Sequence, residues 1–121
     1  MARSCEDLRS CLLFYLELME EERYFEAHEV LESVWYPIRR ERTPLRNLLK
    51  ALINGAVAFE HLKRGRKGAA DRAGRAMAAF DRYRSLCGSE MEESELLHRA
   101  CCKVESIREL NGEFLREPAL T

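Results

Sequence analysis

The chain has 121 residues, of which 46% are hydrophobic and 34% are charged, a composition that suits one globular domain with a helical surface. Its formal net charge of −1 argues against a general attraction to nucleic acid or to a membrane surface. Six glycines and three prolines leave little material for a loop-rich or all-β fold, and no apolar run is long enough to cross a bilayer.

The first predicted helix begins after a capping box formed by Ser4 and Asp7 and runs to about Glu22. Its apolar residues recur every three or four positions, which is the period of one helix face. They are Leu8, Cys11, Leu12, Tyr15, Leu18 and Met19. Near Arg23 the chain either bends into the next helix or makes a turn, and the sequence leaves both alternatives open.

A second helix is predicted from about Tyr24 to Trp35. Pro37 ends it, because a proline biases the residue before it, Tyr36, away from helical angles. This helix holds three carboxylates, one imidazole and three aromatic rings, but no lysine or arginine. Since most surface helices pair their acids with basic residues, this segment is the candidate functional site.

The third predicted helix has Thr43 as its N-cap and Pro44 at its first position, where a missing N–H costs nothing. It runs to about Arg64 and ends at Gly65. Between positions 45 and 62 it is apolar around most of its circumference, which is typical of a central helix.

Two further helices are predicted in the C-terminal half, the fourth closed by Gly88 and the fifth opened by Ser89. The apolar line of the fourth is Ala69, Ala73, Ala76, Met77, Phe80 and Tyr83. That of the fifth is Leu96, Leu97, Ala100, Cys101, Val104, Ile107, Leu110 and Phe114. We therefore expect residues 1–121 to form a single all-α domain, a bundle of about five helices with a central third helix and a last helix over about 90–115.

The cysteines include no Cys-x-x-Cys pair, so a standard zinc knuckle is not expected. They are Cys5, Cys11, Cys87, Cys101 and Cys102. Reduced and mostly buried thiols are the expected state, which is typical of a cytoplasmic protein. The N-terminal residues show no apolar segment of a signal peptide, so the cytoplasm is the predicted location.

A helical wheel of the second helix places four residues on one flank of its apolar stripe: Tyr24, Trp35, His28 and Glu32. His28 and Glu32 are four positions apart and therefore adjacent in space. Glu29 points further outward. The flank thus presents aromatic rings, then an imidazole and then a carboxylate, graded from buried to exposed.

Polar residues also form a line on the otherwise apolar third helix: Arg46, Lys50, Asn54 and His61. Polar groups on a buried helix need partners, because an unpaired one costs about 1–3 kcal/mol. We therefore expect this line to face the second helix, with Arg46 or Lys50 paired with one of its acids. His28 and the last two residues of the line would lie near the same acids.

The residues from about Leu12 to Phe80 resemble the small all-helical bacterial and archaeal family catalogued as domain of unknown function number 309. The family carries an aromatic pair, then Glu-x-His-Glu-x-Leu-Glu and then Trp, which here are Tyr24-Phe25, Glu26 to Glu32 and Trp35. Its next block is matched by Arg46, Leu48-Leu49, Ile53, Ala56-Val57-Ala58, His61 and Lys63-Arg64-Gly65. The resemblance implies a helical bundle and no established activity.

The chain departs from the family pattern at several positions of the third helix. Lys50 and Ala51 stand where the family usually has Gln and Gly, and Asn54 with Gly55 breaks its usual pattern. Glu60 often has a His counterpart in the family. If the family's Gln or first His takes part in chemistry, that chemistry is altered in this member.

Two chemical hypotheses fit the acidic second helix. The first is a divalent-metal site made by His28, Glu32 and His61, since imidazole and carboxylate are ligands of Zn, Mn and Fe. The second is a hydrolase-like small-molecule pocket with Tyr24 and Trp35 as walls, in which His28 and Glu32 are the catalytic candidates. Neither the His-Glu-x-x-His motif nor a neighbouring nucleophile supports them.

The favoured hypothesis is a structural scaffold or protein-interaction module. In it, Glu29 and Glu32 pair with Arg46 and Lys50, His28 is a satisfied interior histidine, and Trp35 belongs to the core. The partner would be another protein or a second copy of the chain. Nucleic-acid binding at the basic turn 63–67 is disfavoured, because basic residues there also complement a helix C-terminus.

Overall fold

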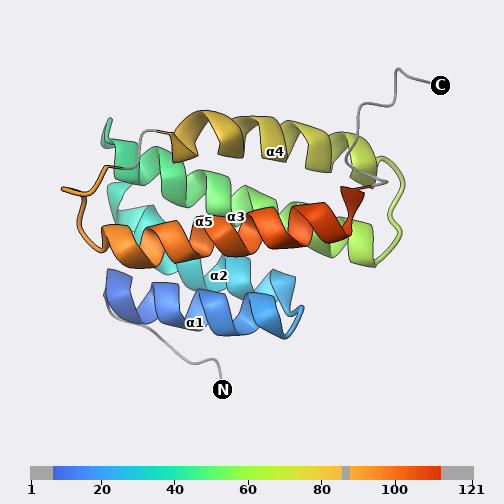
Figure 1. Ribbon diagram of the computed structural model, residues 1–121, viewed down its shortest axis with the longest axis horizontal. Helices are drawn as coiled ribbons and strands as arrows, with labels where there is room; N and C mark the ends of the chain where they lie inside the picture. Colours follow the sequence, from blue (N-terminus) through green and yellow to red (C-terminus); the bar gives the residue numbers. More distant parts are fainter. Residues whose placement is uncertain (1–6, 86–87, 113–121) are drawn as a thin grey trace.

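A computed structural model describes residues 7–85 and 88–112, and within these ranges it contains only helices and loops. The α-helices are α1 (Leu8–Glu20), α2 (Tyr24–Trp35), α3 (Pro44–Lys63), α4 (Ala69–Arg84) and α5 (Ser94–Leu110). A 3-10 turn, η1 (Tyr36–Ile38), follows α2. The predicted all-α bundle with five helices in the described ranges is confirmed (Figure 1).

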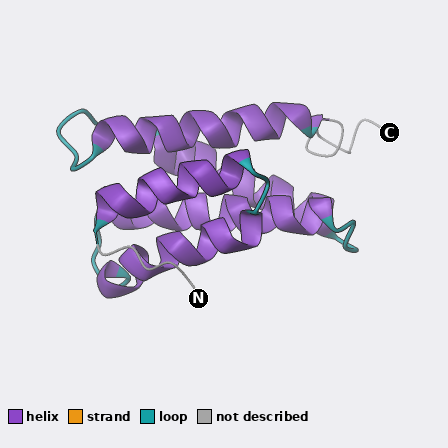
Figure 2. Ribbon diagram, turned by 90° about the horizontal axis from the view of Figure 1, so that it is seen from below, coloured by secondary structure: helices purple, strands orange, loops and turns teal. Residues whose placement is uncertain are grey.

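The helices pack as a row with one helix laid over it. Contacts link α1 to α2, α2 to α3 and α3 to α4, so these four form the row. The last helix, α5, packs against both α1 and α3 and lies along one face of the row (Figure 2). The third helix therefore has neighbours on three sides and is central, as its apolar circumference predicted.

Burial of α3 is nearly complete over its middle turns. Its buried residues are Leu48, Leu49, Ala51, Leu52, Ile53, Gly55, Ala56, Ala58, Phe59 and Glu60. A Cβ placed on Gly55 would lie 3.5 Å from Met77 Cε and 3.8 Å from Val104 Cγ1, so α4 and α5 both approach α3 closely here. From the other side, the fully buried Tyr15 hydroxyl donates to the Leu52 carbonyl oxygen at 2.9 Å.

The first helix begins later than its predicted capping box. Asp7 is the N-cap, and its carboxylate accepts a hydrogen bond from the Ser10 N–H at 2.7 Å; Ser4 lies outside the described residues. Between α1 and α2 the chain makes a turn rather than a bend, with Glu22 at a left-handed φ of 60°. Lys63 Nζ donates to the Glu22 carbonyl oxygen at 2.8 Å, which ties this turn to the end of α3.

The prediction that Pro37 moves Tyr36 away from helical angles is wrong. Tyr36 has φ −55° and ψ −46°, and the chain continues from α2 into η1 with Pro37 inside that turn. At the start of a helical turn the missing N–H of Pro37 costs no hydrogen bond, so η1 accommodates it, while Tyr36 keeps helical angles against the steric preference of a residue before proline. The chain therefore passes from α2 into η1 with no extended residue between them.

The last helix also differs from its predicted start. It begins at Ser94 after Glu93, which has a left-handed φ of 55°, and not at Ser89. Its predicted apolar stripe is buried from Leu96 to Ile107, whereas Leu110 is 83% exposed. Phe114 lies outside the described residues.

The thiols are not all in the predicted state. Cys11 is disulfide-bonded, so the expectation of reduced cysteines is wrong at this position, while Cys5 and Cys87 lie outside the described residues. Cys101 is a buried reduced thiol, and Cys102 is an exposed reduced thiol. In the part of the chain that the structure describes, no helix is long and apolar enough to cross a membrane.

The hydrogen bond between α1 and α3 leads to a first prediction. Tyr15→Phe removes the buried hydroxyl and should lower the free energy of unfolding by about 1 kcal/mol, the usual net value of such a bond. Urea unfolding followed by circular dichroism measures the change. The control is Tyr83→Phe on α4, whose partly exposed side chain should tolerate the loss within about 0.5 kcal/mol. Equal effects of the two substitutions would contradict a specific role for Tyr15.

Candidate functional site

The candidate site lies along the contact between α2 and α3, which run antiparallel. At one end the rings of Tyr24 and Phe59 are 5.7 Å apart, centroid to centroid. At the other end Lys50 Nζ lies 4.3 Å from the centroid of the Trp35 ring, a cation–π contact. The start of α2 therefore lies beside the C-terminal part of α3, and the end of α2 lies beside the N-terminal part. In the sequence, His28 and Glu32 fall between Tyr24 and Trp35.

His28 is held by groups of its own helix. Its side chain is 13% exposed, its Nδ1 hydrogen-bonds the Phe25 carbonyl oxygen, and its ring meets the Phe25 ring edge-on at 4.7 Å. Because a carbonyl oxygen can only accept, Nδ1 carries the proton. In the neutral ring Nε2 then has a free lone pair, and this atom lies 3.5 Å from Glu32 Oε1.

The ion pairs predicted between α2 and α3 are not formed. Among the described residues, no ion pair joins Glu29 or Glu32 to Arg46 or Lys50. Glu29 is exposed, and the Glu32 side chain is 46% exposed with His28 as its neighbour. Both acids are accessible to solvent, whereas the buried residues of α2 are Tyr24, Ala27, Val30 and Leu31.

Lys50 of α3 instead contacts the indole of Trp35, the last residue of α2. Lys50 stacks on the ring, while in the described part of the chain Trp35 Nε1 and Arg46 Nε are buried donors without an acceptor. Each unpaired buried donor costs about 1–3 kcal/mol. A ligand or partner that offers acceptors would remove this cost, so these three residues remain binding candidates.

Sequence reasoning missed the buried carboxylate of Glu60. This residue is 7% exposed and pairs with Arg64 one helical turn later. Burial, followed by the nearby carboxylates of Glu22 and Glu60, raises the pKa of Tyr24 to about 12. The spacing of Glu60 and Arg64 is the signal that could have identified the pair, since residues four apart are neighbours on a helix.

Asn54 and His61 belong to a different contact, that between α3 and α4. Both line a groove of about 280 Å³ together with Arg72 and Arg75 of α4. Arg66 also donates to His61 Nδ1 at 3.1 Å. The prediction that the whole polar line of α3 faces α2 is therefore wrong for these two residues.

The metal hypothesis lacks a complete set of ligands. Among the described residues, no three His, Cys, Asp or Glu side chains are grouped so that they could hold a metal ion. His28 and Glu32 form a pair on α2, whereas His61 lines the α3–α4 groove. The proposed triad of His28, Glu32 and His61 is thus not assembled within this chain.

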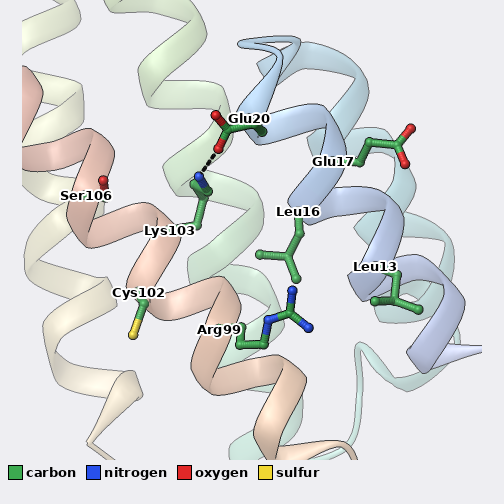
Figure 3. A pocket seen from close by; sticks show the side chains of 8 residues that line it. All are labelled: Leu13, Leu16, Glu17, Glu20, Arg99, Cys102, Lys103 and Ser106. Atoms are coloured by element: carbon green, nitrogen blue, oxygen red, sulfur yellow. Dashed lines mark hydrogen bonds and ion pairs between the residues drawn. The ribbon is translucent and has the colours of Figure 1, made fainter.

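Another groove, of about 590 Å³, lies between α1 and α5 and includes no predicted site residue (Figure 3). Leu13 and Leu16 of α1 line it together with Arg99 and Cys102 of α5. An ion pair between Glu20 and Lys103 bridges the two helices. Positive and negative groups are both present in this groove, so it gives no clear preference for one kind of ligand.

The surroundings of His61 predict a dependence of stability on pH. Burial and then the charges of Arg66 and Arg72 lower the pKa of His61 from its ordinary value. Below about pH 6.5 the unfolded chain therefore binds this proton more readily than the folded protein. The contribution of His61 to the free energy of unfolding is fully present above that pH. It is lost as the pH falls through the lowered pKa of His61 in the folded protein.

Urea midpoints at pH 7.5 and 5.5 measure this loss. His61→Gln should reduce the difference between the two midpoints, because Gln does not titrate. His98→Gln removes an exposed imidazole from α5 and is the control for the loss of a histidine. If His61→Gln keeps the full difference of the parent protein, the lowered pKa of His61 does not affect stability.

Comparison with known proteins identifies a family but no function. A search of curated proteins and a search of solved structures found no match. A family model described as "Domain of unknown function (DUF309)" matches residues 12–73, which include α2, η1, α3 and the acidic motif. Because the match covers half of the chain, the protein belongs to the DUF309 family.

Proposed function

We propose that the protein is an interaction module that binds a basic, partly apolar segment of a partner protein on the outer face of α2 and η1. Two aromatic side chains at the ends of this face carry the proposal. Phe25 is 53% exposed and Tyr36 is 60% exposed. They are eleven positions apart, about three helical turns, so they lie on the same side of α2 and its continuation.

Acidic side chains occupy the space between these rings. Glu29 and Glu32 lie between them at helical spacing, and no lysine or arginine occurs on α2. Together, Phe25, Glu29, Glu32 and Tyr36 form what we call the docking face. A partner segment with cations beside apolar side chains would be complementary to it, because aromatic anchors and charge matching are typical of protein interfaces.

Neighbouring residues hold both rings in place before any partner binds. His28 contacts the Phe25 ring edge-on, and the Arg39 guanidinium stacks 3.6 Å from the centroid of Tyr36. Rings that are already ordered lose less conformational entropy on binding, which favours affinity. The histidine of the motif therefore supports the docking face and does not need to carry out chemistry.

The test uses a labelled helical peptide of lysines with leucines at i, i+4 and i+7, and measures binding by fluorescence polarisation. Phe25→Ser combined with Glu29→Gln should weaken binding at least about tenfold, equivalent to about 1.4 kcal/mol. The matched control is Leu110→Ser with Glu109→Gln, which removes one exposed apolar group and one charge from α5. It should leave the affinity within about twofold.

Two outcomes would overturn the docking face. One is equal weakening by the two double variants, which would indicate nonspecific attraction. The other is equal binding of a peptide in which glutamates replace the lysines. Dimerisation of the protein that the Phe25 variant removes would identify a second copy as the partner instead of another protein.

The alternative is a metal-dependent or hydrolase-like site at the His28–Glu32 pair, where Nε2 faces a carboxylate at 3.5 Å. In our proposal Glu32→Gln should change the free energy of unfolding by less than about 0.5 kcal/mol, because the side chain is half exposed. Zinc or manganese should not shift the melting temperature of the parent protein. A metal-induced rise that Glu32→Gln removes would favour the alternative.

The proposed location is the cytoplasm. The two reduced thiols, Cys101 and Cys102, support it, and the disulfide at Cys11 counts against it. Counting reactive thiols in protein purified without reductant distinguishes the fully reduced chain from the disulfide-bonded one. The fully reduced chain has five reactive thiols, and each disulfide within the chain lowers this number by two.

A further inference from the structure

The groove between α3 and α4 is lined by both polar and small apolar side chains. Its volume is about 280 Å³, and it is lined by Asn54, Val57, Ala58, His61, Arg72, Arg75, Ala76 and Ala79. The polar side chains come from both helices. The small apolar side chains of α3 and α4 leave room between the helices and provide a surface for a carbon skeleton.

Cationic side chains line this groove and no carboxylate does. In the described part of the chain neither Arg72 nor Arg75 forms an ion pair, so both guanidinium groups can bind an anion. The groove between α1 and α5 differs, because Glu17 and Glu20 line it beside its cations. The groove at the α3–α4 turn likewise includes Asp71.

His61 adds a hydrogen-bond donor to the same groove. A guanidinium group can only donate, so the 3.1 Å contact from Arg66 requires an unprotonated Nδ1 on His61. The neutral ring then carries its proton on Nε2, which is a donor. The charged groups that act on His61 are Arg66, Arg72, Glu60 and Arg64, and their combined effect with burial keeps the ring neutral to lower pH.

We propose that this groove binds the phosphate group of a small soluble phosphomonoester. Arg72, Arg75 and the Nε2–H of His61 supply donors for its three terminal oxygens, and the Asn54 amide adds another. The volume suits a ligand of modest size, whose carbon skeleton would lie against Ala76 and its apolar neighbours. The net charge of −1 does not favour a long polyanion over such a ligand.

The probe is phenyl phosphate at pH 7.5, with benzyl alcohol as its uncharged counterpart. Amide NMR spectra of the full chain should show shifts at groove residues with phenyl phosphate and none with benzyl alcohol. The bound dianion would offset the surrounding cations, so the pKa of His61, followed by its ring proton signals, should rise on binding. A purely structural role for these residues would not move that pKa.

Matched charge variants test the arginines. Arg72→Gln with Arg75→Gln should weaken phenyl phosphate binding at least about tenfold. Arg40→Gln with Arg82→Gln removes the same charge from exposed positions outside the groove and should change the affinity less than about twofold. Asn54→Asp places a carboxylate at an exposed position of the groove, and should abolish binding while leaving the fold intact.

The proposal is overturned if both double variants weaken binding equally, or if phenyl phosphate leaves the pKa of His61 unchanged. Two further probes are tested separately: vesicles that contain phosphatidic acid, and a single-stranded oligonucleotide. Binding of either one at a concentration where phenyl phosphate does not bind would assign the groove to a membrane surface or to nucleic acid and would also overturn it.

Discussion

The burial of the middle turns of α3 is the constraint on which the rest of the structure depends. Neighbours cover it on three sides, and its buried residues include the charged Glu60, which needs Arg64 as its partner. Polar residues of α3 can then reach solvent only at the edges of these contacts. Polar residues of α3 lie at two such edges, Lys50 beside α2 and Asn54 with His61 beside α4, and the second edge is the groove proposed to bind phosphate.

This constraint explains how far the candidate site could be predicted from the sequence. The wheel correctly grouped Lys50 and Asn54, since four positions on a helix differ by only about 40°. The wheel does not show that Lys50 lies beside α2 while Asn54 lies beside α4. Which helix neighbours each residue depends on tertiary packing. The predicted ion pairs of Glu29 and Glu32 with α3 are wrong for the same reason. The wheel gives the direction of a side chain around its own helix, but it does not show whether a neighbouring helix is close enough to contact that side chain.

The helices themselves were predictable because their signals are local. The Thr43 cap, the proline after it and the apolar stripes all depend on residues within a few positions, and the stripe of α5 is buried as expected up to Ile107. The start of α5 depends on Glu93 adopting a left-handed conformation, which nothing in its residue type favours. Likewise, Tyr36 keeps helical angles before Pro37 against the local preference of that position.

The acidic motif of α2 was the most conspicuous feature of the sequence, and its histidine has a local explanation. His28 Nδ1 binds a carbonyl oxygen of its own helix, and its ring supports Phe25. Both contacts fix the ring and leave Nε2 with Glu32 as its neighbour, so a metal would find two donors there and not three. A third donor would have to come from a partner, and the side of the molecule that could receive that partner is the exposed aromatic and acidic face itself. The metal and interaction hypotheses therefore concern the same surface of α2, and they differ in the bound species, a metal ion held by His28 and Glu32 or a basic segment of a partner protein.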